Sequence, residues 1–188
     1  SSTSSKELTI EALIERLERE ATSGEAAGYD RAASRLEQAA GQAVHDDQLR
    51  DLLKVFQVFL RHRQADSLGA PLLERAGRAV ETISGGRTVP YLVEHLWTET
   101  GEVAEELSTA LVGLGSKVIP GLLGRVARED WNGARERIVA TLARCSEAAP
   151  SDLTQALQAL NGDQASHIAR MLGEVGSASA ADLLAVLL

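Results

Sequence analysis

The feature of this sequence that most limits its fold is an internal repeat. Residues 88–93, 118–123 and 149–153 begin alike, each with an apolar or small residue and a proline ahead of a leucine. A fourth segment that starts at Ala180 fits the same frame without the proline. Each segment begins 30 or 31 residues after the one before it. A period of this length is typical of architectures in which one supersecondary unit stacks on the next.

The apolar residues within each unit recur with helical spacing. In the first half of the unit the aligned positions are Leu92, Leu122, Leu153 and Leu183, followed by Leu96, Val126, Leu157 and Leu187. In the second half they are Leu107, Ile138 and Ile168, then Leu111, Leu142 and Leu172, then Leu114, Cys145 and Val175. The second-half positions lie at i, i+4 and i+7, which is one face of a helix. We therefore expect two-helix hairpins that bury their apolar faces against one another.

The same periodicity extends over the rest of the chain and predicts no strand. The predicted helices are 7–21, 29–44, 47–64, 70–84, 89–99, 102–115, 119–129, 134–146, 151–161, 163–176 and 180–188. Turn-forming pairs such as Gly85-Gly86 and Asn161-Gly162 separate them. The prolines near the helix starts cost little, because the N–H that proline lacks would be unpaired there. The fold class predicted from these patterns is all-α.

The repeat also resembles a known family. Its pattern is Val-Pro-x-Leu-x-x-x-Leu, an acidic turn, and a small-residue helix ending Ala-Leu-x-x-Leu-Gly, with residues 118–146 as the best match. This pattern is similar to the short bacterial HEAT repeat, also called phycobilisome-lyase-like. The resemblance implies a right-handed α-solenoid of stacked helical hairpins, with about five pairs and a terminal helix.

The resemblance also implies roles for particular residues. In the family a turn aspartate and a second-helix arginine tie adjacent repeats together, and Asp130 and Arg135 occupy these positions here. Ala104 and Ala165 stand where the arginines of the neighbouring repeats would be, so we expect an incomplete ladder of polar ties.

The repeats predict a division of the chain. Residues 88–188 carry the HEAT-like repeats, residues 6–87 are expected to form helical pairs that are divergent repeats, and residues 1–5 read as a linker or an expression remnant. Residues 183–188 contain four leucines and no following helix to cover them. Terminal repeats normally carry a polar outer face. We therefore expect the repeats to continue beyond the C-terminus, with self-association through this helix as the alternative.

Composition narrows the functional classes. With 44% apolar and 24% charged residues, the 188-residue chain has the composition of a folded protein. A formal charge of −8 argues against broad neutralisation of nucleic-acid phosphates. No apolar run approaches the ~20 residues needed to cross a bilayer, and the sequence shows no signal peptide. We expect a cytoplasmic protein that does not contact a membrane.

The sequence predicts no catalytic residue, no metal site and no cofactor. The triplet His45-Asp46-Asp47 could suggest a metal-dependent phosphohydrolase, but such a site needs an earlier histidine and none precedes residue 45. A helix boundary explains the triplet better, with Asp46 and Asp47 at the start of the next helix. Cys145 aligns with two apolar positions, so it is expected to pack as a small hydrophobe rather than act as a nucleophile.

The predicted binding surface is the concave one, formed by the second helices opposite the Leu111, Leu142 and Leu172 stripe. Its polar members are Glu106, Arg137, Arg144, His167, Arg170 and Glu174. An ordinary solvated face is the alternative interpretation of this strip. Trp97 and Trp131 are candidate aromatic anchors for a partner, although tryptophans at repeat turns more often pack beneath the neighbouring hairpin.

The predicted function is that of a non-catalytic scaffold that binds a protein partner of unknown identity, with arginines of the concave strip contacting acidic or polar groups. The alternative is a nucleic-acid-binding HEAT-like protein or a DNA glycosylase-like enzyme. Residues 119–146 are locally basic, but their five arginines fall short of the 6–10 phosphate contacts of strong duplex binding. A lyase-like role with bilin chromophores rests on the repeat name alone.

Overall fold

The computed structural model describes residues 9–128 and 134–188, and over these residues all regular elements are helices. The all-α class predicted from the sequence is therefore confirmed. The chain divides into two compact units, Ser1–Thr88 and Val89–Leu188, called unit 1 and unit 2 below.

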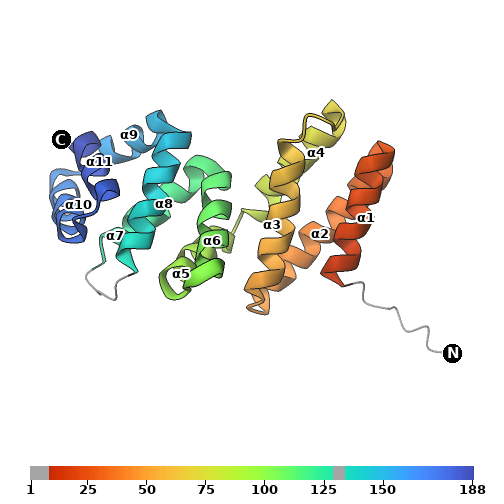
Figure 1. The fold of residues 1–188 in the computed structure, drawn as a ribbon, viewed down its shortest axis with the longest axis horizontal. Helices are drawn as coiled ribbons and strands as arrows, with labels where there is room; N and C mark the ends of the chain where they lie inside the picture. The colour runs from red at the N-terminus through yellow and green to blue at the C-terminus, as the bar shows by residue number, and fades with distance from the viewer. Residues whose placement is uncertain (1–8, 129–133) are drawn as a thin grey trace. The chain divides into compact units, whose positions relative to one another are not determined.

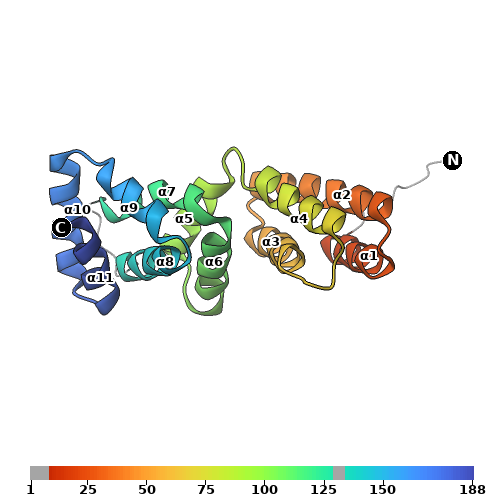
Figure 2. The same ribbon diagram turned by 90° about the horizontal axis from the view of Figure 1, so that it is seen from above.

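Unit 1 contains two helical hairpins that pack on each other. The helices are α1 (Ile10–Ser23), α2 (Ala26–His45), α3 (Leu49–Arg63) and α4 (Ala70–Ile83). Helices α1 and α3 lie in one layer, and α2 and α4 lie in the other (Figure 2). Leucine, alanine and aromatic side chains fill the space between the layers, with Leu17, Leu36, Phe56 and Phe59 fully buried.

Unit 2 contains the repeated segment. Its elements are α5 (Thr88–Thr98), α6 (Gly101–Leu114), the short 3-10 helix η1 (Gly115–Val118), α7 (Ile119–Val126), α8 (Arg135–Ala148), α9 (Pro150–Gln158), α10 (Gly162–Val175) and α11 (Ala178–Leu187). These helices follow one another along the unit in Figure 1. Helix α8 packs against α6, α7, α9 and α11, and α10 contacts α7, α8 and α11. Each helix of both units overlaps one of the ranges predicted from the sequence.

The helix boundaries follow local chemistry. Proline occupies the first turn of α4, α7 and α9. The side chain of Asn161 accepts a hydrogen bond from the backbone N–H of Gln164, whose side chain in turn accepts one from the N–H of Asn161, so this capping box starts α10. Gly24 and Gly176 end α1 and α10 with φ of 72° and 64°, a left-handed conformation that glycine adopts without steric cost.

The predicted apolar positions of the repeat are buried. Leu111 and Leu142 are 0% exposed and Leu172 is 2% exposed. Of the aligned positions in both helices of the hairpins, only Leu187 and Val175 are half-buried, and both lie toward the end of the chain. The predicted register of the helices is therefore confirmed.

One helix boundary differs from the prediction. Asp46 and Asp47 do not start α3, because Asp46 is the C-cap of α2 and α3 begins at Leu49. The backbone N–H of Asp46 donates to the carbonyl of Gln42, and Asp47 has a φ of 56°. Aspartate tolerates this left-handed conformation better than most residues, so the pair forms the turn after α2 rather than a helix N-terminus.

Contrary to the sequence analysis, one stretch of the described residues, Gly101–Val126, is long and apolar enough to cross a membrane by length and composition alone. Half of its most apolar window is buried inside the protein. Gly115, with a φ of 77°, ends α6 within the stretch, and η1 leads from there into α7. The stretch is therefore folded as separate helices that take part in the core of unit 2.

Candidate functional site

Arg137, a member of the predicted binding strip, makes its hydrogen bonds within unit 2. Its guanidinium lies at the C-terminal end of α5 and donates hydrogen bonds to the carbonyls of Leu96 at 3.4 Å and Trp97 at 3.1 Å. Unpaired carbonyls at a helix C-terminus attract cations. Arg137 therefore ties α8 to the C-terminal end of α5.

His167 repeats this arrangement one period later. It lies 30 residues after Arg137, and its Nε2 donates to the carbonyl of Ala127 at 2.5 Å, at the end of α7. Ala127 likewise lies 30 residues after Trp97. The Nδ1 of His167 lies 3.1 Å from Arg170, which can only donate, so Nδ1 accepts from Arg170 while Nε2 donates to Ala127. Arg137 and His167 thus make the same kind of contact, from α8 to the end of α5 and from α10 to the end of α7.

Arg144 starts a chain of hydrogen bonds between α6 and α8. It donates to the hydroxyl of Ser108 at 2.7 Å and to that of Thr109 at 3.2 Å. Ser108 lies 2.9 Å from the hydroxyl of Thr141, and Thr141 donates to the carbonyl of Arg137 at 2.8 Å. Because Thr141 uses its own proton there, the hydroxyl of Ser108 donates to Thr141. The two second helices are joined by polar contacts as well as by leucines.

Three predicted strip residues remain. Glu106 is half-buried on α6, and Arg170 and Glu174 lie on α10. Arg170 and Glu174 are exposed on α10 and form an ion pair at 3.2 Å. Glu174 also accepts a hydrogen bond from Arg135 at 3.4 Å. Arg135 is 1% exposed and donates to the carbonyl of Arg128 at 2.6 Å. It therefore links α8 both to the end of α7 and to α10, whereas its predicted partner Asp130 lies outside the described residues.

Trp97 is the one of the two proposed aromatic anchors that lies within the described residues. Trp97 is 4% exposed, and the guanidinium of Arg125 stacks over its ring, 3.8 Å from the ring centre. Such stacking is a cation–π contact. Trp97 is thus buried beneath Arg125 of α7, while Trp131 lies outside the described residues.

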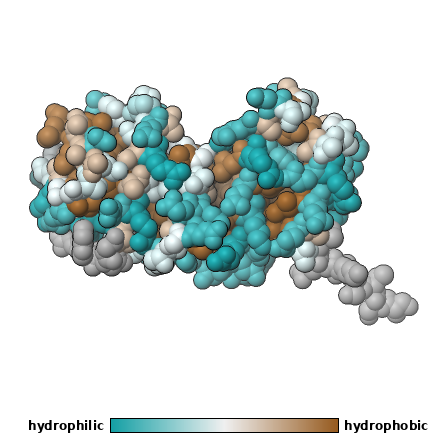
Figure 3. All heavy atoms as spheres, in the orientation of Figure 1, coloured by the Kyte–Doolittle hydropathy of each residue, from teal (hydrophilic) through white to brown (hydrophobic). Residues whose placement is uncertain are grey.

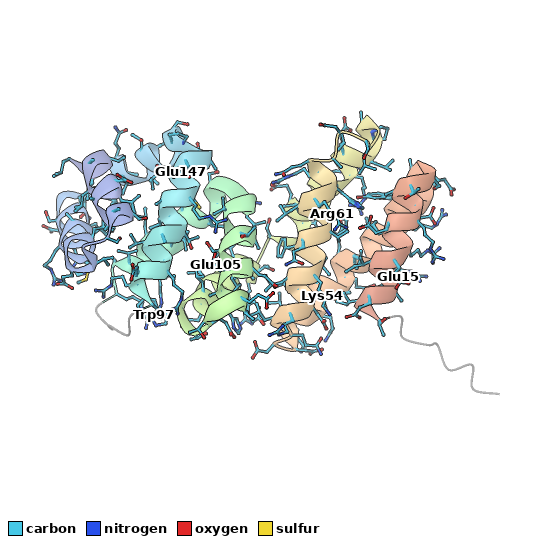
Figure 4. The ribbon with its side chains drawn as sticks, viewed as in Figure 1. Glu15, Lys54, Arg61, Trp97, Glu105 and Glu147 are labelled. Atoms are coloured by element: carbon cyan, nitrogen blue, oxygen red, sulfur yellow. The ribbon has the colours of Figure 1, made fainter. Side chains whose placement is uncertain are left out.

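The exposed charged side chains on α6 and α8 are carboxylates. They are Glu102, Glu105, Glu136 and Glu147. Figure 4 shows Glu105 on α6 and Glu147 near the end of α8. The arginines of the same two helices, Arg135, Arg137 and Arg144, are buried or half-buried. The surface of these two helices is therefore negatively charged. The sequence alone suggested a strip in which arginines predominate.

Unit 1 carries a regular set of ion pairs between α1 and α3. Lys54 pairs with Glu11, and one heptad further along both helices Arg61 pairs with Glu18. Figure 4 shows Lys54 and Arg61 along α3. These side chains are exposed to solvent, which screens the charges, so the pairs contribute little to stability.

A buried polar chain, which the sequence analysis did not predict, joins three helices of unit 1. The Nδ1 of His62 lies 2.9 Å from the hydroxyl of Tyr29, and its Nε2 lies 3.0 Å from a carboxylate oxygen of Glu18. Since an ionised carboxylate only accepts, Nε2 donates to Glu18, and Nδ1 shares the second hydrogen bond with the Tyr29 hydroxyl. Burial raises the pKa of Tyr29 above its usual value.

This Glu18–His62–Tyr29 chain has the order of groups that activates nucleophiles in some enzymes. Tyr29 is 1% exposed, however, so a substrate cannot reach its hydroxyl in this conformation. His62 and Glu18 line a pocket of about 450 Å³ together with Arg61. The arrangement fits a satisfied polar contact in the core of unit 1.

The remaining candidates behave as packing or surface groups. Cys145 is 3% exposed and burial raises its pKa to about 11, which keeps the thiol protonated and unreactive at neutral pH. No group of three or more histidine, cysteine or acidic side chains with metal-binding geometry occurs among residues 9–128 and 134–188. His45 is exposed at the end of α2.

The surface on the side shown in Figure 3 is largely hydrophilic, with apolar residues gathered over the C-terminal helices. The large apolar side chains that are exposed in the described residues are Val186 and Leu188, at the end of α11 and just beyond it.

Comparison with models of protein families, with curated proteins and with solved structures finds no match for this chain. The proposals below therefore depend on the geometry of these residues.

Proposed function

We propose that this chain is a non-catalytic scaffold of the HEAT type, a right-handed α-solenoid of stacked hairpins that binds a protein partner along its second helices. The observation that carries the proposal is the repeated contact made by Arg137 and His167. Each lies at the same place in its repeat and binds the C-terminal end of the first helix in the preceding hairpin. A contact that recurs with the sequence period supports stacking by a constant operation.

The partner surface consists of the exposed carboxylates Glu102, Glu105, Glu136 and Glu147 on α6 and α8. Glu105 and Glu136 are 31 residues apart, so they occupy the same repeat position on neighbouring second helices. Because Arg137 and Arg144 donate to groups within the protein, they are less available to a partner than the sequence suggested. We infer that the surface takes a basic peptide segment.

The proposal is tested with a library of random peptides displayed on phage and selected on the immobilised chain. Binding of the enriched peptides is then measured by fluorescence polarisation for the variant Glu105→Lys with Glu136→Lys. We expect peptides rich in lysine and arginine, and at least a tenfold loss of affinity in the variant. The control is Glu74→Lys with Asp182→Lys, which changes the net charge equally at exposed positions on other helices. It is expected to bind within about twofold of the wild type.

Two results would contradict this function. Equal losses in the surface variant and the control would mean that overall charge, and not this surface, governs binding. Salt-sensitive binding of labelled duplex DNA at sub-micromolar concentration would favour the nucleic-acid alternative instead. The cytoplasmic location and the bacterial origin of the repeat remain predictions.

A further inference from the structure

A mainly apolar pocket of about 600 Å³ lies between α7, α9 and α10 in unit 2. Leu123, Ala127, Ala156 and Leu160 contribute apolar wall, and His167 is among the polar residues that α10 adds. The volume falls in the range of pockets that bind small molecules or single large side chains.

The repeat explains where the pocket comes from. In the alignment of first helices, Ala127 of α7 corresponds to Trp97 of α5, and Ala156 of α9 corresponds to Arg125 of α7. Trp97 and Arg125 stack on each other, at 3.8 Å, and are 4% and 5% exposed. One hairpin later both large side chains are replaced by alanine, and both alanines line the pocket. The pocket therefore lies at the position that the Trp97–Arg125 stack occupies one repeat earlier, but no large side chains fill it.

A hydrogen bond beside the stack also recurs beside the pocket. Arg137 donates to the carbonyl of Trp97, and the equivalent His167 donates to the carbonyl of Ala127 at 2.5 Å. His167 also lines the pocket. The backbone contact found at Trp97 is thus repeated at Ala127 beside the pocket, where the indole and the guanidinium are missing.

We propose that this pocket binds an aromatic side chain, above all a tryptophan, presented by a partner polypeptide. The indole enters between Ala127 and Ala156 and occupies the volume that Trp97 and Arg125 fill in the preceding hairpin. The site lies apart from the exposed carboxylates of α6 and α8, so this proposal and the proposed function can fail independently.

The test uses N-acetyl-L-tryptophanamide as the probe and the full chain labelled with nitrogen-15. Saturable shifts of the amide signals of residues around the pocket are expected, with a dissociation constant on the order of 1 mM for so small a ligand. N-acetyl-L-leucinamide should bind at least tenfold more weakly. Equal binding of the two probes would overturn the proposal, as would the absence of shifts around the pocket at saturating probe.

The decisive variant rebuilds the stack in place. Ala127→Trp with Ala156→Arg should fill the pocket, abolish probe binding and leave the melting temperature unchanged or higher. The control, Ala27→Trp with Ala26→Arg, adds the same side chains at exposed positions of α2 and should bind the probe normally. Probe binding that survives the filled pocket would place the site elsewhere.

A second variant tests whether the chain's own Trp131, rather than a partner, occupies the pocket. Trp131→Phe removes the tryptophan that follows α7 in sequence and should leave the affinity for the probe within about twofold. Tighter binding in this variant would show that Trp131 competes for the pocket, which would overturn the assignment of the site to a partner.

Discussion

Replacing Leu142 by alanine removes one buried side chain from α8, where this helix packs against its neighbours. Leu142 is 0% exposed and lies on α8, which packs against α6, α7, α9 and α11. The substitution deletes buried carbon atoms that are worth ~0.8 kcal/mol each. It also leaves a cavity, because helices held on several sides cannot collapse onto it. We expect the free energy of unfolding to fall by ~2–5 kcal/mol.

The assay is urea denaturation followed by far-ultraviolet circular dichroism. If units 1 and 2 unfold in separate transitions, the loss should appear in the transition that belongs to Val89–Leu188. The control is Glu102→Ala, an exposed position in the first turn of α6, which should change stability by no more than ~0.5 kcal/mol. Equal midpoints for the two variants would refute the assignment of Leu142 to a shared interface.

Three further predictions concern single contacts. Tyr29→Phe leaves Nδ1 of His62 buried without its hydrogen-bond partner and should lower stability by ~1–3 kcal/mol in a melt; an unchanged value would mean that the contact is not formed. Arg137→Leu removes the hydrogen bonds to Leu96 and Trp97 and should cost ~1–3 kcal/mol in urea denaturation, whereas no loss would show that the contact is not structural. The raised pKa of Cys145 means that, as the pH rises from about 9 to 11, the unfolded thiol loses its proton before the folded one. Stability should therefore fall with rising pH in this window, and Cys145→Ala should lose that part of the dependence; an identical slope in the variant would contradict the assignment.

The helices and the buried face of the repeat could be predicted because both depend on local spacing. Apolar residues at i, i+4 and i+7 identify the buried face whatever lies opposite to it, and Leu111, Leu142 and Leu172 are all buried. The packing of Cys145 followed from its alignment with two apolar positions. A repeat strengthens such inference, because each unit is a separate observation of the same environment.

The polar contacts could not be predicted in this way because they join residues far apart in sequence. Arg137 lies opposite the apolar stripe and so looks solvent-facing, but its long side chain reaches carbonyls 40 and 41 residues earlier. His62 did carry a signal, since it follows the buried Phe59 by three residues and therefore lies on the buried face of α3. The pocket could also have been found, by asking which residues align with Trp97 and Arg125.

The most direct test of the stacked-hairpin account is to duplicate one hairpin. A second copy of residues 119–148, inserted after Ala148, adds one full period at the boundary between repeats. The matched control duplicates 134–148 alone, which adds a single helix without its partner. If hairpins stack by a constant operation, the longer chain should stay monomeric with the same helical signal per residue and a larger urea m-value, while the control should lose cooperative unfolding. A full-period insertion that aggregates or unfolds, beside a control that stays folded, would contradict the account.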